Sequence, residues 1–198
     1  MYWYEDEVKR LENDRGKLGY EPETVFYGSS SIRLWASLYR DFGSIKPANL
    51  GFGGSTLAAC VWFFERIMAP YHPKRLIIYA GDNDLGDGRH PEEVFIFFQE
   101  LAVKINIRFG GIPCYFISLK PSICRWHMAN AYRFTNTIVE NEIKKYGNNW
   151  HFVDVFNKML DGSGRPKSEF FVADGLHLSE KGYQLWRAII NNYIAANS

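Results

Sequence analysis

The chain has 198 residues and a formal net charge of +1, and 46% of its residues are hydrophobic and 17% aromatic. One domain usually takes roughly 100 to 200 residues, and this composition can form a sizeable core, so we expect one compact domain over residues 1–198. The 23 basic residues are nearly balanced by 22 acidic ones. The chain therefore has no broad positive field for a polyanion, which argues against nucleic acid as a partner.

The hydrophobic runs of the chain are far shorter than the roughly 18 residues that a membrane-spanning helix needs. The three cysteines, Cys60, Cys114 and Cys124, cannot all pair within one chain, and none lies at the CxxC spacing typical of zinc sites. Free thiols are typical of a reducing compartment, so we expect a soluble, cytoplasmic protein. A secreted protein whose signal peptide has been removed would have the same sequence, and the sequence leaves the oligomeric state open.

Short apolar segments alternate with helical patterns along the chain. The predicted strands are Thr24 to Tyr27, Ala48 to Gly51, Arg75 to Tyr79, Pro113 to Ser118 and His151 to Val155. The predicted helices are Tyr4 to Lys17, Thr56 to Met68, Pro91 to Phe109, Arg125 to Tyr146 and Ser179 to Ala196. Ser55 or Thr56, Pro91 and Ser179 stand at positions that suit a helix start.

This alternation predicts an α/β fold with three layers, in which helices cover both faces of a five-stranded parallel sheet of flavodoxin-like order. Ligands of such sheets bind beyond the carboxyl ends of the strands. The loops that begin near Gly28, Gly51, Gly81, Ser118 and Phe156 are therefore the places to look for chemistry.

The first strand ends in a turn with three consecutive serines, Ser29 to Ser31, after Gly28. Serine is common in turns and helix caps, so a nucleophile needs a base as further support. Asp174 and His177 stand just before the last helix and could meet a serine at the same sheet edge. Asp87 and His90 have the same spacing, but His90 lies in a polar, glycine-rich loop beside Pro91, where a solvated histidine is the simpler interpretation.

Two further loops contain groups that could stabilise an oxyanion. The second strand leads into Gly53 and Gly54, whose backbone N–H groups can approach a ligand closely, and the third leads into Asn83, whose amide is a neutral donor. A glycine-rich loop can also hold a phosphate group, and asparagine is common in turns. All these groups follow strands at the same edge, which favours catalysis.

These blocks together resemble the GDSL, or SGNH, hydrolase family, over Val25 to about Tyr183. The resemblance implies that Ser30 is the nucleophile, with Asp174 and His177 completing the triad, and that the oxyanion hole is formed by Ser30, Gly54 and Asn83. Ser29 stands where the family has an aspartate outside the triad. The motif Gly-Ser-Ser-Ser-Ile-Arg-x-Trp is similar to platelet-activating-factor-acetylhydrolase-like and short-chain acyl esterases.

The resemblance implies a serine esterase that acts on small acyl esters, most plausibly acetyl esters of a carbohydrate or another alcohol, with no metal or organic cofactor. Three alternatives stay open: a flavodoxin-like module that binds a flavin or nucleotide, a lysophospholipase or thioesterase of the same family, and a catalytically silent binding member. Most aromatic residues at helical spacing should lie in the core. Lys120, Trp126 and Phe171 are the candidates for contact with the substrate.

Overall fold

The computed structural model describes residues 1–197, and within them five strands form one parallel sheet. The strands are β1 (Thr24–Gly28), β2 (Pro47–Gly51), β3 (Arg75–Tyr79), β4 (Cys114–Ile117) and β5 (Trp150–Val153). Their order is β2-β1-β3-β4-β5, and each neighbouring pair is parallel. The predicted flavodoxin-like sheet is therefore confirmed, and the carboxyl ends of all strands lie at one edge.

The longer helices are α1 (Glu5–Asp14), α4 (Leu57–Trp62), α7 (Pro91–Phe109), α8 (Ala129–Ile143) and α9 (Glu180–Ala196). The shorter ones are α2 (Ser30–Arg33), α3 (Leu38–Asp41), α5 (Phe64–Ile67) and α6 (Asp82–Gly86). Within residues 1–197, none of the helices combines the length and the hydrophobicity that crossing a bilayer requires.

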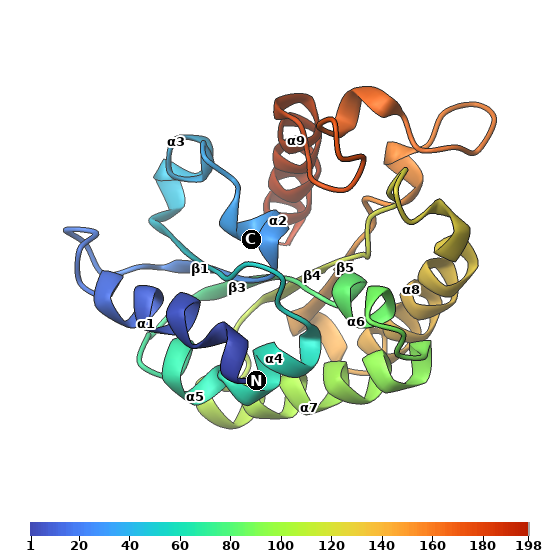
Figure 1. Ribbon diagram of the computed structural model, residues 1–198. Helices are drawn as coiled ribbons and strands as arrows, with labels where there is room; N and C mark the ends of the chain where they lie inside the picture. Colours follow the sequence, from blue (N-terminus) through green and yellow to red (C-terminus); the bar gives the residue numbers. More distant parts are fainter. Residues whose placement is uncertain (198) are drawn as a thin grey trace.

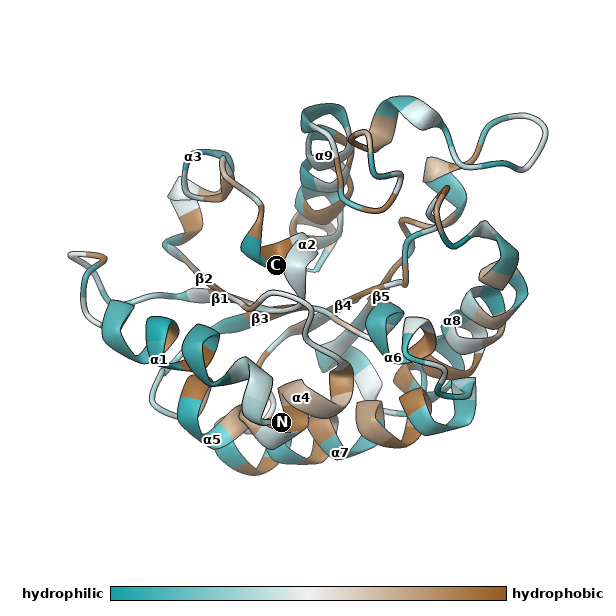
Figure 2. Cartoon of the chain, viewed as in Figure 1, coloured by the Kyte–Doolittle hydropathy of each residue, from teal (hydrophilic) through white to brown (hydrophobic). Residues whose placement is uncertain are grey.

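The helices cover the sheet on both sides, which confirms the three-layer arrangement. In Figure 1, α1, α4, α5, α7 and α8 lie on one side of the sheet and α3 and α9 on the other. Side chains alternate between these sides along each strand: Val25 and Tyr27 belong to the core under α4 and α7, and Phe26 to the core under α9. Figure 2 shows hydrophilic and hydrophobic stretches alternating along the helices, as expected for helices with one buried side.

Two predicted helices differ from the observed ones. The segment Thr56 to Met68 is interrupted at Phe63, where α4 ends and α5 follows, and this turn lets the consecutive rings of Phe63 and Phe64 both enter the core. The segment predicted from Arg125 begins as a 3-10 turn, Trp126–Met128, and becomes α-helical only at Ala129. Periodicity alone marks where a helix can form, and tertiary packing shifts its ends.

The predicted helix starts are observed. Thr56 Oγ1 accepts a hydrogen bond from the Ala59 N–H at 3.0 Å at the start of α4, and Ser179 Oγ accepts one from the Gly182 N–H at 3.2 Å at the start of α9. Pro91 is the first residue of α7. These caps matter for function because α4 and α9 follow directly on loops that carry candidate site residues.

Candidate active site

The turn after β1 presents one of its three serines. Gly28 has φ +142°, and a Cβ there would collide with the carbonyl oxygen of Tyr79 on the neighbouring strand. The sharp turn brings Ser30 to the start of α2. Ser29 and Ser31 are 0% and 1% exposed, whereas Ser30 is partly exposed. Ser30 is therefore the hydroxyl that this turn offers to a ligand.

Ser30, His177 and Asp174 form a continuous chain of hydrogen-bonding contacts. His177 Nε2 lies 3.1 Å from Ser30 Oγ, and His177 Nδ1 lies 2.6 Å from Asp174 Oδ2. The other carboxylate oxygen, Oδ1, accepts hydrogen bonds from the backbone N–H groups of Leu176 and His177 at 2.8 and 2.9 Å. The structure thus brings together residues that lie 147 positions apart, in the order expected for nucleophile, base and orienting carboxylate.

The environment of Asp174 keeps it charged. The hydrogen bond with His177 and those from the two backbone N–H groups lower the pKa of Asp174 to about 2. An ionised carboxylate accepts a hydrogen bond from a protonated His177 Nδ1. His177 Nε2 then carries no proton and can take the proton of Ser30. The carboxylate therefore determines the tautomer of the imidazole.

The second Asp-x-x-His pair has a structural position. His90 is exposed and stands at the N-cap of α7, and its backbone N–H donates to Glu93 Oε2 at 2.8 Å. This arrangement is a helix-capping box, in which the Glu93 side chain satisfies the first backbone donor. His90 thus caps α7 together with Glu93, whereas His177 contacts Ser30.

The three predicted oxyanion donors lie in the segments that directly follow β1, β2 and β3. The Ser30 N–H is in the first turn of α2, where a helix has no internal acceptors for its N–H groups. Gly54 is exposed in the loop between β2 and α4 and has φ +67°. Within residues 1–197, no backbone hydrogen bond engages the Gly54 N–H. Asn83, in α6, donates through Nδ2 to the Ser55 carbonyl at 3.1 Å, which joins two of these loops and leaves its second N–H.

Arg125 holds the amide of Asn83. Its Nη1 donates to Asn83 Oδ1 at 3.1 Å and to the carbonyl of Asp82 at 2.9 Å. Gly86 makes room for the guanidinium, because a Cβ there would lie 2.7 Å from Arg125 Cζ. Oδ1 is thereby directed at Arg125 and Nδ2 at the opposite side. From the sequence, Arg125 is expected only as the start of a helix, since no local pattern links the loops after β3 and β4.

Lys120 does not lie where the sequence led us to expect it. We expected it to contact the substrate, but Lys120 is 1% exposed and its Nζ lies 3.2 Å from Asp82 Oδ2. Burial raises the pKa of Asp82, yet the nearby Lys120 and Arg125 charges outweigh burial and leave that pKa below its ordinary value. A buried ammonium needs such a partner, so the pair joins the ends of β3 and β4 inside the fold.

The two aromatic candidates for substrate contact are placed differently. Trp126 is partly buried, stacks on Phe156 with ring centroids 6.5 Å apart, and has the Arg133 and Arg165 guanidinium groups 5.3 and 5.9 Å from its ring. Phe171 is 6% exposed and borders a cavity of about 470 Å³ that also touches Asp174. Substrate contact by either residue stays a prediction.

Asp84, which the sequence analysis did not single out, anchors the helix after the Gly54 loop. It is 0% exposed and accepts hydrogen bonds from the N–H groups of Leu57 and Ala58 at 2.6 and 3.3 Å. Burial raises the pKa of Asp84 to about 6, against the lowering effect of those two N–H groups and of Arg89. Asn83 and Asp84 therefore connect the loop after β3 to both ends of the segment from Ser55 to Ala58.

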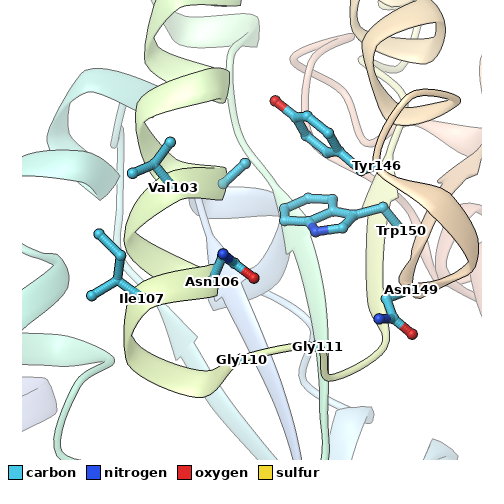
Figure 3. Close-up of a pocket in the computed structure, with 9 residues that line it drawn as sticks. Val103, Asn106, Ile107, Gly110, Gly111, Tyr146, Asn149 and Trp150 are labelled. Carbon is cyan, nitrogen blue, oxygen red and sulfur yellow. The ribbon is translucent and has the colours of Figure 1, made fainter.

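Another cavity, of about 330 Å³, lies at the opposite edge of the sheet. Figure 3 shows side chains that line it: Val103, Asn106 and Ile107 come from α7, Tyr146 and Asn149 from the segment before β5, and Trp150 from the start of β5. Trp150 is the first residue of β5, whereas Ser30 follows the end of β1. The cavity is thus at the amino ends of the strands and separate from the Ser30 edge.

Comparisons with known proteins show the fold and the family of this chain. No similar protein is found among curated sequences. A platelet activating factor protein from Streptococcus pneumoniae has a similar solved structure, with 21% identity, a TM-score of 0.84 and coverage of 96% of this chain and 92% of that one. An acylhydrolase from Bacteroides fragilis has 20% identity and a TM-score of 0.78, with 95% of each chain covered. A GDSL-like lipase from Bacteroides thetaiotaomicron has 18% identity and a TM-score of 0.74, with 96% and 98% covered.

At these identities the solved structures show a shared fold. The family itself is shown by the sequence, because residues 19–185 match the model of the GDSL-like lipase/acylhydrolase family. The match spans most of the chain and contains all five residues of the predicted triad and oxyanion hole. The chain therefore belongs to the GDSL-like lipase/acylhydrolase family and is a carboxylic ester hydrolase.

Proposed function

We propose that this hydrolase is a serine esterase that cleaves small acyl esters, in particular acetyl esters of a carbohydrate or another alcohol, through an acyl-enzyme. The observation that carries the proposal is the unbroken contact from Ser30 Oγ through His177 to Asp174, at 3.1 and 2.6 Å. A flavin- or nucleotide-binding module would give this arrangement no role, and the family match favours ester hydrolysis.

In the first half of the proposed reaction, Ser30 Oγ attacks the carbonyl carbon of the ester while His177 Nε2 takes the hydroxyl proton. The carbonyl oxygen becomes an oxyanion in the tetrahedral intermediate. His177, now an imidazolium stabilised by the Asp174 carboxylate, returns the proton to the leaving alcohol as its bond to the carbonyl carbon breaks. The acyl group is then bound to Ser30.

In the second half, water replaces the alcohol. His177 takes a proton from the water molecule as its oxygen attacks the acyl carbon, and it returns the proton to Ser30 Oγ when the acid leaves. Both halves pass through an oxyanion, which the N–H groups of Ser30 and Gly54 and the Asn83 amide would receive. Each such donor contributes on the order of 3 kcal/mol in comparable sites.

Three of the loops at the Ser30 edge are short, and this supports a small acyl group. Five residues or fewer separate each of β1, β2 and β3 from the helix that follows. A shallow wall gains little from each additional methylene of a longer chain, because one methylene in an apolar pocket changes specificity by only about 1 to 3 kcal/mol. We therefore expect acetyl to butyryl esters to be preferred.

The nucleophile is tested with three single serine variants. Ser30→Ala should abolish hydrolysis of p-nitrophenyl acetate, because it removes the only one of the three hydroxyls that contacts His177. Ser29→Ala and Ser31→Ala are matched controls from the same turn and should keep most of the activity. Wild-type turnover by purified Ser30→Ala would remove Ser30 as the nucleophile.

The substrate class is tested by measuring kcat/KM for p-nitrophenyl esters from acetyl to decanoyl, followed by acetylated sugars. A maximum at acetyl to butyryl is the expected result. A maximum at octanoyl or longer would contradict the short-chain proposal and favour a lysophospholipase-like role, while preference for acyl thioesters would favour a thioesterase. Folded protein without turnover on any acyl ester would favour a silent binding member.

A further inference from the structure

The N-terminal segment of the chain lies against the loop that carries Gly54. Tyr4, the residue before α1, donates through Oη to the Gly54 carbonyl at 3.1 Å. Glu7, in the first turn of α1, accepts a hydrogen bond from the Gly53 N–H through Oε2, also at 3.1 Å. Two side chains of one short segment thus contact the backbone of two adjacent glycines.

These contacts fall on both sides of the predicted oxyanion donor. The Gly54 N–H belongs to the peptide that joins Gly53 to Gly54. Glu7 holds the preceding peptide through the Gly53 N–H, and Tyr4 holds the following one through the Gly54 carbonyl. Within residues 1–197, no heavy atom beyond Gly54 and its two neighbours in the chain lies within 4 Å of the position that a Cβ of Gly54 would take, so side-chain packing contributes little to its placement. Two consecutive glycines are otherwise the most mobile backbone the chain can have.

Both holding groups are themselves fixed. The Tyr4 ring is 6% exposed and packs edge-on against Phe52, with centroids 5.7 Å apart. Glu7 also binds Arg33, with Nε 2.6 Å from Oε2, and Arg10, with Nη2 3.2 Å from the same oxygen. Arg33 is the last residue of α2, the helix that begins with Ser30. One carboxylate therefore joins the nucleophile's helix to the oxyanion loop.

The electrostatics of Glu7 agree with this position. Burial raises the pKa of Glu7, but the Gly53 N–H and the Arg10 and Arg33 guanidinium groups outweigh burial and hold the pKa below its ordinary value. Glu7 therefore stays ionised at neutral pH. A hydrogen bond to an ionised carboxylate is stronger than one between neutral groups. Helix α1 is also attached to α5, because Arg66 binds Glu5 at 2.9 Å and Glu12 at 2.8 Å. Residues 4 and 7 lie outside the segment 19–185 that matches the family model.

We propose that Tyr4 and Glu7 are positioning residues that hold the Gly54 N–H in line with the Ser30 and Asn83 donors. The inference rests on the proposed function, in which Gly54 is an oxyanion donor. Displacing a donor weakens binding of the tetrahedral intermediate more than binding of the substrate. Such a displacement should therefore lower kcat and leave KM nearly unchanged.

The test uses Tyr4→Phe, which keeps the ring and removes the hydroxyl, and Glu7→Gln, which keeps the shape and removes the charge. With p-nitrophenyl acetate, we expect each variant to lower kcat about tenfold and both together about a hundredfold, with KM within about twofold of wild type. These losses are smaller than the roughly 100- to 1,000-fold effect of deleting a donor outright.

The matched control is Glu12→Gln, which removes a carboxylate of the same helix that binds Arg66 and does not contact the Gly54 loop. Tyr2→Phe serves as the control for the tyrosine, since Tyr2 is exposed. Melting temperatures are measured for all variants. If Glu12→Gln lowers kcat as much as Glu7→Gln, the effect comes from loosening α1 in general and the inference is wrong.

Ser30→Ala, measured in parallel, separates this inference from the proposed function. Activity in Ser30→Ala would contradict the proposed function itself. An inactive Ser30→Ala together with wild-type kcat in Tyr4→Phe and Glu7→Gln would overturn the positioning role alone. If Glu7→Gln fails to fold, Tyr4→Phe decides, because it removes one oxygen atom from a packed ring.

Discussion

The hydrogen bond between His177 and Asp174 determines which ring nitrogen faces Ser30. Asp174 accepts a hydrogen bond from the Nδ1–H group, with Oδ2 2.6 Å from Nδ1, and its own position is set by the two backbone N–H groups of its turn. A neutral amide in place of the carboxylate would neither stabilise the imidazolium nor select the same tautomer. In the proposed mechanism, the reactivity of Ser30 thus depends on Asp174, which stands three residues before His177.

The first prediction follows from this dependence. His177→Ala should lower kcat at least about a thousandfold, and Asp174→Asn should cause a loss of similar order through the wrong tautomer. His90→Ala should keep wild-type kcat, because its loop caps α7. Steady-state kinetics of the three purified variants check this. A severe loss in His90→Ala with an active His177→Ala would contradict the choice between the two Asp-x-x-His pairs.

Arg125 acts on the same residue scale through the orientation of one amide. An asparagine side chain can rotate by 180° and present its oxygen, which would repel an oxyanion, in place of its N–H group. The Arg125 guanidinium donates to Asn83 Oδ1 and so disfavours the rotated form. In the proposed reaction, Arg125 would also place a positive charge near the developing oxyanion.

The second prediction is that Arg125→Met lowers kcat about tenfold and leaves KM nearly unchanged, because a donor would be misdirected in the transition state. Arg133→Met is the control, since Arg133 contacts Trp126 and Phe156. In an Asn83→Ala background, Arg125→Met should have little further effect on kcat. Independent effects of the two substitutions would show that Arg125 does not act through Asn83.

On the scale of elements, the N-terminus of α4 is fixed by a buried carboxylate. Asp84 accepts the N–H groups of Leu57 and Ala58, which α4 cannot satisfy internally. Its native pKa of about 6 lies above its ordinary value of 3.8. Over the pH range between these two values, Asp84 is therefore largely protonated in the native state and largely ionised in the unfolded chain.

The third prediction concerns the change of the free energy of unfolding with pH. Between pH 4 and pH 6 the native state binds more protons at Asp84, so its contribution lowers the free energy of unfolding as the pH rises through this window, by about 3 kcal/mol at most. Asp84→Asn cannot titrate and should remove that dependence. Urea denaturation at pH 4 to 8 measures the effect, with the exposed Asp87→Asn as control. An unchanged pH profile in Asp84→Asn would show that Asp84 does not carry the shift.

On the scale of the whole molecule, an aromatic cluster connects the segments that carry Ser30 and His177. Trp35 follows α2, and its ring lies 4.9 Å from Tyr183 and 6.2 Å from Trp186, both on α9. Trp186 also lies 4.9 Å from Tyr79 at the end of β3. Tyr183 Oη donates to the Ser31 carbonyl at 3.1 Å. The helix that follows His177 is therefore packed directly against the turn that carries Ser30.

The fourth prediction concerns this cluster. Trp186 is fully buried, so Trp186→Ala should lower the free energy of unfolding by about 3 to 5 kcal/mol. Trp62→Ala removes a side chain of the same size that is 69% exposed, and it should change stability by no more than about 0.5 kcal/mol. Urea denaturation measures both. A loss below 1 kcal/mol for Trp186→Ala would contradict the role of the cluster.

Local patterns in the sequence determined the order of strands and helices. Hydropathy predicted all five strands within two residues of their observed ends, and the glycine, asparagine and histidine blocks that follow them lie at one edge because parallel strands all end there. The helix caps at Thr56 and Ser179 could also be predicted from the sequence, since a cap depends on one side chain and the backbone N–H of the residue three positions later. These features involve neighbours in the chain.

Tertiary structure alone decided the contacts between loops. Lys120 pairs with Asp82 inside the fold, Arg125 holds Asn83, and Tyr4 and Glu7 hold the Gly54 loop, over separations of 38, 42, 50 and 46 residues. No periodicity in the sequence encodes such pairs. Whether a lysine at a strand end faces solvent or a buried carboxylate, and which loop an arginine reaches, depends on how the helices pack on the sheet, because that packing sets the distances between the loops.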